Sequence, residues 1–428
     1  MLFESAVLRY TMFRRRSFNG ASSAYLKALH RCIYIVSLST IIDSTVVLTV
    51  EFIKKRIVNI ELKYMKKRKN VNKSIRILSI IAFGIGLLAF FIQRGARNNT
   101  HFAEWISVHI GTPIRMLMAN LFGWFRASVA ELLILLSPMI IFTVILCAAK
   151  QRDSKSRVRY ASGILAVVCI FYSIYVFTLG VGYHRFTVSE KMELADVEVT
   201  RDNLYSTLLE LEAKCNDLID EIDYAEDGSS IMHAEFDDVS RVISDAYYKL
   251  DEEYPDLALM PFDSVAKPVK FSKAMSMLEI LGIYTFFTGE SCVNVHYPDY
   301  TVPFTVAHEL AHQRGISREN EANFIAFLVC IRCDDPYIKY SGYLNMYEYI
   351  ASALAKTDKE LLKEAYASLD DRIYGEMVAY SKFYNENKNE LTAKISNFFN
   401  DNYLKSQGTA GVVSYGLVVE LCVSYFEK

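Results

Sequence analysis

Three long segments without a charged residue constrain this chain of 428 residues most strongly. They cover residues 77–93, 132–149 and 161–183. Each reaches the length of roughly 17 to 25 residues that a helix needs to cross the hydrocarbon core of a bilayer. One such segment could be a buried helix of a soluble protein, whereas three in succession, each flanked by charge, indicate a membrane protein. We therefore expect three transmembrane helices in contact with the lipid bilayer.

A fourth apolar segment, residues 32–50, is ambiguous. Asp43 lies near its middle, where a carboxylate costs roughly 2.5 to 3.5 kcal/mol on insertion scales. Basic residues flank the segment on both sides, which conflicts with the positive-inside rule. The sequence does not decide whether this segment spans the membrane. A cleavable signal peptide is not expected, because the apolar run begins late and more basic residues follow it.

Basic residues in the connecting segments predict the orientation. Residues 54–76, before the first span, and residues 150–160, between the second and third, are rich in Lys and Arg. Such segments face the cytoplasm, so three crossings place the chain after residue 183 outside it. The loop 94–131 is then also external. Its segment 113–125, "PIRMLMANLFGWF", predicts a helix that either lies at the membrane surface or packs between the spans.

The second half of the chain has the pattern of a water-soluble domain. We expect a basic N-terminal extension over 1–75, a transmembrane domain over 76–183 and a mostly helical external domain over 184–428. Periodicity predicts late helices at 337–355, 358–369, 371–389 and 391–404, and β-branched and aromatic residues predict short strands around 283–286 and 292–296. The predicted fold class is therefore mainly α, with transmembrane helices and a small β-sheet. The net charge of −2 gives no reason to expect a nucleic-acid partner.

The run His308-Glu309-Leu310-Ala311-His312 is the clearest chemical motif. On a helix, residues i and i+4 lie on one face, so both imidazoles can bind one metal ion. Glu309 projects from nearly the same side and can take a proton from water bound to that ion. Pro303 suits the first turn of such a helix and Gly315 its end. Without a metal, the buried His-Glu-His arrangement would be costly.

A catalytic zinc needs a third protein ligand and an open position. The next segment predicts a second helix with Ser317 as its N-cap. Glu321 lies beside the apolar stripe of this helix, so we favour it as the third ligand, with Glu319 as the alternative. In the absence of a metal, Glu321 could pair with Arg314 or Arg318.

Four other residues near the motif have open roles. Asn323 either orients a ligand or is a surface amide, and Arg314 either contacts substrate or braces the turn. Cys330 and Cys333 form a single C-x-x-C pair, for which two buried positions on a helix are a simpler interpretation than a zinc site. Two imidazoles and one carboxylate suit zinc without excluding iron or manganese.

The residues quoted above also carry a family resemblance. The run "TVAHELAHQRGISRENEANFIAF", with "GIYTFFTGES" and "FTLGVGYHR" upstream, resembles a bacterial family of polytopic membrane proteins. That family is a domain of unknown function, zinc-metallopeptidase-like, and the resemblance covers roughly residues 75–428. The run "ENEAN" is also similar to the E-x-E-A-D helix of HtpX-like membrane peptidases. There the second Glu binds zinc, which implies Glu321 here, and Asn323 stands in the position of the Asp.

This resemblance implies a zincin-like domain in which an extended substrate pairs with a short strand near the metal. The segment "ESCVNVHYP" is the expected strand, so that Asn294 and His296 would line the cleft. His296 is otherwise a candidate fourth metal ligand. Oxyanion stabilisation would need a Tyr, His or Arg near the zinc, and Tyr340, Tyr343 and Tyr347 are candidates without a preference among them.

We therefore expect a membrane-anchored zinc metallopeptidase of the HExxH type that hydrolyses peptide or wall-amide bonds outside the cytoplasm. One Zn²⁺ would be bound by His308, His312 and Glu321, and Glu309 would act as general base and then acid. The substrate would be a peptide, a protein or a cell-envelope component. The alternative is a non-catalytic, zinc-containing membrane module that binds a partner protein or an envelope component. An intramembrane protease is disfavoured because the motif has polar flanks.

Overall fold

The structure is a computed structural model that describes residues 44–409, 411 and 417–427. Contacts group the chain into two compact units, Met1–Arg76 and Ile77–Lys428. The described part of the first unit belongs to helix α3 (Ser44–Asn98). The boundary predicted at residue 183 lies inside the second unit. In the ambiguous segment 32–50, residues 32–43 lie outside the described residues, so a fourth span stays a prediction.

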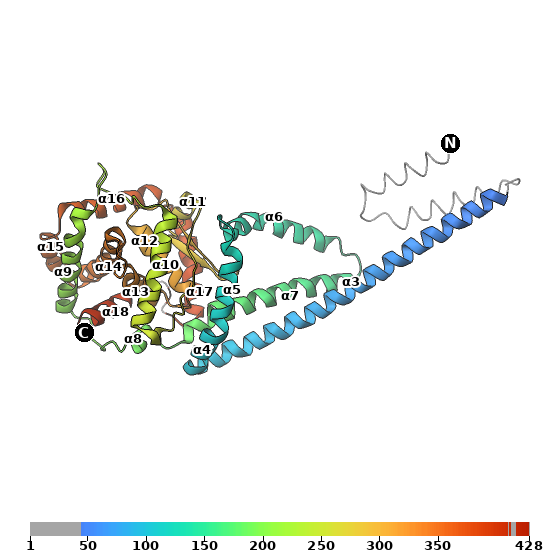
Figure 1. Cartoon of the computed structure of the whole chain (residues 1–428), viewed down its shortest axis with the longest axis horizontal. Coiled ribbons are helices and arrows are strands. Elements are labelled where there is room, and N and C mark those ends of the chain that lie inside the picture. The colour runs from blue at the N-terminus through green and yellow to red at the C-terminus, as the bar shows by residue number, and fades with distance from the viewer. Residues whose placement is uncertain (1–43, 410, 412–416, 428) are drawn as a thin grey trace. The chain divides into compact units, whose positions relative to one another are not determined.

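Three helices of the described chain are long and apolar enough to cross a membrane, as predicted. They are the Lys73–Asn98 part of α3, α6 (Val129–Ala149) and α7 (Ser154–Thr178) (Figure 1). Ser128 and Asp153 begin α6 and α7, since each side chain accepts a hydrogen bond from a backbone N–H of the first turn. The apolar stretch of α6 is left uncovered by the rest of the described protein, which suits a lipid-facing helix.

The segment between the first two spans is helical. It consists of α4 (Thr100–Ile106), a π-helical turn η1 (Ser107–Gly111) and α5 (Thr112–Gly123). Arg115 of α5 is buried and donates to the carbonyls of Ser107 and Thr178, so the carbonyl end of α7 lies against its charge. The opposite side of α5 leaves Leu117 and Leu121 exposed, so apolar side chains are available for the predicted contact with the membrane surface.

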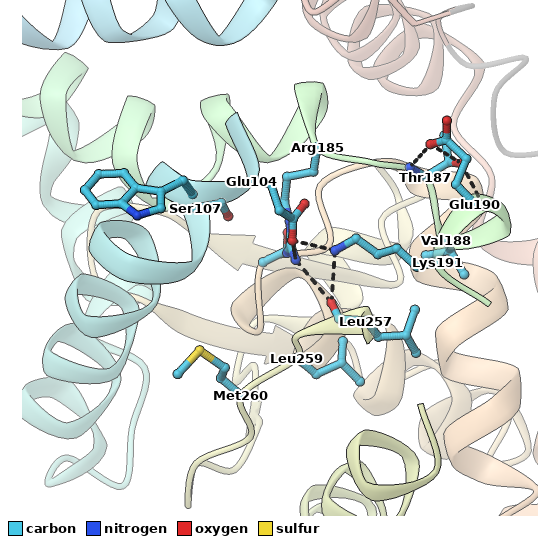
Figure 2. A network of polar contacts seen from close by, with 12 residues as sticks. Glu104, Ser107, Arg185, Thr187, Val188, Glu190, Lys191, Leu257, Leu259 and Met260 are labelled. Atoms are coloured by element: carbon cyan, nitrogen blue, oxygen red, sulfur yellow. Dashed lines mark hydrogen bonds and ion pairs between the residues drawn. The ribbon is translucent and has the colours of Figure 1, made fainter. Parts of the chain in front are cut away.

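Polar contacts join α4 to the segment that follows α7 (Figure 2). The Glu104 carboxylate pairs with Arg185 at 2.7 Å and with Lys191 at 2.5 Å. Both cations also donate to the carbonyl of Leu257. Thr187 and Glu190 form a capping box that begins α8 (Val188–Lys191). These contacts fix the end of the third span to the domain that follows it.

The sheet has three strands in the order β1-β3-β2, with β1 at Lys267–Pro268, β2 at Gly282–Thr285 and β3 at Glu290–Val293. The central strand β3 is parallel to β1 and antiparallel to β2. The two predicted strands are therefore present with slightly different ends, and the two-residue β1 is an addition.

Helices α12 (Thr301–Gln313) and α13 (Glu319–Cys330) lie at the centre of the remaining helices, and nearly all of their residues are buried. The surrounding helices are α9 (Arg201–Leu218), α10 (Phe236–Glu253), α11 (Ser272–Ser276), α14 (Pro336–Thr357), α15 (Lys359–Tyr366), α16 (Asp371–Asn387), α17 (Glu390–Ser406) and α18 (Val418–Phe426), with short turns η2 (Gly180–His184), η3 (Ile219–Glu221) and η4 (Pro255–Leu257). The four helices predicted between 337 and 404 are confirmed with small shifts of their ends. The protein is thus mostly helical with a small sheet, as predicted.

Candidate metal centre

Helix α12 carries the His-Glu-Leu-Ala-His motif and has the predicted ends. Pro303 lies in its first turn, and Gly315 follows the C-cap residue Arg314 with a φ of +96°. This left-handed conformation favours glycine. A Cβ at Gly315 would also lie 2.5 Å from Nη2 of Arg115, so the chain can turn here only without a side chain.

The bend between α12 and α13 is held by the end of α7. The Ser317 hydroxyl donates to the carbonyl of Leu179 at 2.8 Å, and Arg185 donates to the carbonyl of Gly315 at 3.1 Å. Arg318, not Ser317, is the N-cap residue of α13, and no side chain caps this helix. The predicted Ser317 cap is therefore corrected, because its hydroxyl is used by the membrane-proximal segment.

Two histidines and one glutamate meet at the bend. His308 Nε2 lies 3.1 Å from His312 Nε2, and Glu319 Oε2 lies 3.3 and 3.4 Å from these two nitrogens. We call His308, His312 and Glu319 the metal cluster. Within the described residues, it is the group of three or more His, Cys, Asp or Glu side chains that could hold a metal ion.

Glu321, favoured from the sequence as the third ligand, points elsewhere. Its Oε1 accepts hydrogen bonds from Arg318 at 2.7 Å and from the backbone N–H of Val188 at 3.2 Å. The structure therefore replaces Glu321 by the alternative, Glu319, as the candidate third ligand. The apolar stripe misled the prediction because every residue from Glu321 to Cys330 is buried, so burial does not distinguish the face of α13 that meets the histidines.

A hydrogen bond to the backbone orients the His312 ring so that Nε2 faces the cluster. Its Nδ1 lies 2.7 Å from the carbonyl of Ile316, which can only accept a hydrogen bond, so Nδ1 carries the proton. Nε2 is then the ring nitrogen that faces the cluster and that, after losing its proton, would bind a metal ion, as in other histidine ligands oriented by a second hydrogen bond.

The pKa values of His312 and Glu319 show that a positive charge is stabilised within the metal cluster. Burial opposes the charged form of His312, but the Glu319 carboxylate outweighs it and raises the pKa of His312 to about 9. Burial would also raise the pKa of Glu319, yet the two histidines hold this pKa far below its usual value. A cation placed among these atoms would supply the same compensation.

Glu309 lies beside the cluster with unused hydrogen-bonding capacity. Its Oε2 atom is buried and has no hydrogen-bond partner among the described residues. Burial raises the pKa of Glu309 to about 7, although the neighbouring histidines lower it. An unpartnered buried carboxylate oxygen needs explanation, and a carboxylate with a pKa near neutrality suits general base catalysis.

Strand β2 forms the wall next to Glu309. The backbone N–H of Tyr284 donates to the Glu309 carboxylate, and a Cβ at Gly282 would lie 2.5 Å from Glu309 Oε1. β2 is an outer strand of the described sheet, so one of its edges has no strand neighbour there. Gly282 is also a functional candidate. The sequence did not single it out, although it is the first residue of the segment "GIYTFFTGES".

The segment predicted to pair with substrate, "ESCVNVHYP", contains the central strand β3, whose two edges are both occupied. β1 pairs with β3 at Cys292 and Val293, whereas the outer edge of β2 has no strand neighbour in the described sheet, which makes β2 the better candidate for this role. Asn294 donates to Ser276 and to the carbonyl of Ile280. His296 bonds Ser276 and packs on Phe383. Neither side chain joins the metal cluster.

The other residues singled out from the sequence, Arg314, Asn323, Cys330 and Cys333, are not members of the metal cluster. Arg314 is fully buried, donates to Ser244 and the Phe262 carbonyl, and lies over the Tyr247 ring, so it braces the fold. Asn323 donates to the hydroxyl of Tyr349 at 3.1 Å. Cys330 and Cys333 are buried and stand apart from the metal cluster.

The three tyrosines proposed for oxyanion stabilisation have contacts away from the metal cluster. Tyr340 donates to Glu376, and Tyr343 packs on Phe327, while Tyr347 is buried in the core. Tyr349, which the sequence did not single out, is close enough to Glu319 to sense its charge: burial and this charge raise the pKa of Tyr349. Its position on α14 could not be selected from 28 tyrosines without knowing the packing.

A comparison with known protein families finds a match. The family described as "Protein of unknown function (DUF3810)" matches residues 107–423. The chain belongs to this family. No curated protein and no solved structure matches it. The DUF3810 region contains the second and third spans, β2 and the complete metal cluster.

The donor set of this DUF3810 protein fits zinc. A tetrahedral ion with ligand bonds of about 2.1 Å needs donor atoms roughly 3.4 Å apart. The three separations in the cluster are 3.1, 3.3 and 3.4 Å. Three converging protein ligands leave one position free, which is the arrangement of catalytic rather than structural zinc sites.

Proposed function

We propose that the protein is a membrane-anchored zinc metallopeptidase that hydrolyses peptide bonds. The observation that carries the proposal is the juxtaposition of the metal cluster with Glu309, whose buried Oε2 has no partner among the described residues. His308, His312 and Glu319 would hold the ion. Zinc bound to such a donor set acts as a Lewis acid and makes hydroxide available near neutral pH.

Glu309 would carry out the proton transfers of the reaction. Glu309 Oε2 accepts the proton of the attacking water, and the same carboxyl group then donates it to the leaving amine nitrogen. A pKa of about 7 suits both transfers. The Glu309 carbonyl accepts from Ser291 at 2.8 Å, so β3 also holds the helix that presents this group.

The free edge of β2 would bind the substrate in extended form. Backbone groups of an outer strand can pair with an added peptide. Because Tyr284 and Gly282 on this edge contact Glu309, a peptide paired there would pass the carboxylate. The positive-inside pattern of the loops supports a catalytic domain outside the cytoplasm.

The test uses the full-length protein purified in detergent. Wild type should contain about one zinc per chain and cleave members of an unfolded peptide library. Glu309→Gln should keep the zinc and lose cleavage, because it removes the proton acceptor without removing a ligand. Zinc binding without cleavage by wild type would favour the non-catalytic module. A wild-type protein that binds no zinc would refute both.

A further inference from the structure

One side of α17 is apolar and exposed. Leu391, Ile395, Phe398 and Phe399 are 69%, 48%, 64% and 67% exposed. Their spacing places them on one face of the helix. A contiguous group of large exposed apolar side chains is typical of a surface that binds a protein, a membrane or a ligand.

The C-terminal end of α17 is attached to the ends of two spans. The Tyr403 ring packs on Tyr175, in the last turn of α7, with ring centroids 6.3 Å apart. Arg97, in the last turn of α3, donates to the carbonyl of Ser406 at 3.2 Å.

The N-terminal end of α17 is connected to the remaining span. The Thr392 hydroxyl donates to the carbonyl of Met277, directly after the five-residue helix α11. Phe271, directly before α11, donates its backbone N–H to Glu131 at 2.8 Å. Glu131 belongs to the first turn of α6. The C-terminal end of α17 therefore contacts the ends of α7 and α3 directly, and its N-terminal end is connected to the start of α6 through α11.

These span ends lie on one side of a bilayer. Successive spans cross in alternating directions, so the Asn98 end of α3, the Val129 end of α6 and the Thr178 end of α7 share a side. A helix tied at both ends to this level must run along the membrane surface. The pattern is repeated at α5: Leu117 and Leu121 on the helix, and Trp124 and Phe125 directly after it, have the same spacing and are also exposed.

We propose that α17 is a second membrane-surface helix, whose face Leu391, Ile395, Phe398 and Phe399 is covered by lipid of the adjoining leaflet. Helices of this kind bury their apolar face about 5–10 Å into the boundary between headgroups and acyl chains. Continuity with the three spans favours lipid over a second copy of the chain. The proposal does not depend on the metal cluster.

The test measures quenching of tryptophan fluorescence by brominated acyl chains in nanodiscs that contain the full-length protein. The sequence has two tryptophans, so Trp105→Phe and Trp124→Phe give a background for Phe398→Trp. Tyr374→Trp is the matched control, since Tyr374 is 51% exposed on α16 and packs on Tyr366 of α15. Phe398→Trp should lose most of its fluorescence and Tyr374→Trp little.

A second measurement keeps the proposal testable if this background does not fold. Photoreactive benzoylphenylalanine at position 399 replaces one aromatic ring by another. Adducts with lipid support the proposal. Crosslinks between two copies, the absence of any lipid adduct, or equal quenching of Phe398→Trp and Tyr374→Trp would overturn it.

Discussion

Glu319 and Glu321 lie two positions apart on α13 and have different partners. Glu319 contacts both histidines, whereas Glu321 is bound by Arg318 and the Val188 backbone. We predict that Glu319→Gln lowers the zinc content of the purified protein severalfold, because an amide is a poor substitute for an anionic ligand. Glu321→Gln should retain zinc. Metal analysis of both variants checks this, and the reverse result would restore Glu321 as ligand.

Gly282 sets the position of Glu309. Because a Cβ at this position would lie 2.5 Å from Glu309 Oε1, Gly282→Ala should displace the carboxylate. A displacement of about 1 Å can cost roughly 100-fold in rate, so we expect a large loss of kcat with zinc retained. Gly163→Ala is the control, since a Cβ there meets nothing within 4 Å. Equal activity of the two variants would contradict the role of Gly282.

At the scale of the residue, the sequence predicted which two histidines meet but not which glutamate joins them. The spacing of His308 and His312 on one helix determines that they meet, and the structure brings them together. The choice between Glu319 and Glu321 depends on how α13 leaves the bend, and that is set by Leu179 and Arg185, which are more than 100 positions away in the chain. Local periodicity contains no such information.

At the scale of the elements, Glu348 connects α14 to the start of α12. The Tyr300 hydroxyl, just before α12, donates to both Glu348 oxygens at 3.1 and 3.2 Å. Burial raises the pKa of Glu348 to about 7, partly opposed by this hydrogen bond. The folded protein therefore keeps a proton that the unfolded chain releases near its ordinary pKa of 4.5, and stability falls as the pH rises between these values.

We predict that Glu348→Gln reduces this pH dependence, because glutamine still accepts from Tyr300 and has no proton to lose. Each unit of pKa shift corresponds to about 1.4 kcal/mol. The midpoint of thermal unfolding in detergent, measured at pH 5 and pH 8, should therefore decline more for wild type than for the variant. Parallel declines would show that Glu348 does not titrate in this range.

The helices could be predicted from the sequence pattern, whereas the tertiary contacts between distant elements could not. The three spans and the four late helices were predicted from apolar length and spacing. In contrast, Glu290 at the start of β3 accepts from the backbone N–H groups of Val129 and Ala130 and from Lys267. This contact joins the sheet to the first turn of α6 across 160 positions, and no pattern within either segment predicts it.

At the scale of the whole molecule, the orientation in the membrane determines where the site acts. The basic segments predict that the domain with the metal cluster lies outside the cytoplasm. We expect an impermeant maleimide to label Glu226→Cys in intact spheroplasts, and Lys155→Cys only after lysis. Both positions are exposed, so accessibility does not bias the comparison. Labelling in the opposite order would place the site in the cytoplasm.

We propose that three side chains from α12 and α13 hold one ion beside Glu309. The most direct measurement is anomalous scattering at the zinc edge from crystals of the full-length protein. We predict a single peak about 2.0–2.2 Å from His308 Nε2, His312 Nε2 and a Glu319 oxygen. A zinc-supplemented crystal with no peak at this position, or with a peak bound by Glu321 instead, would contradict the account.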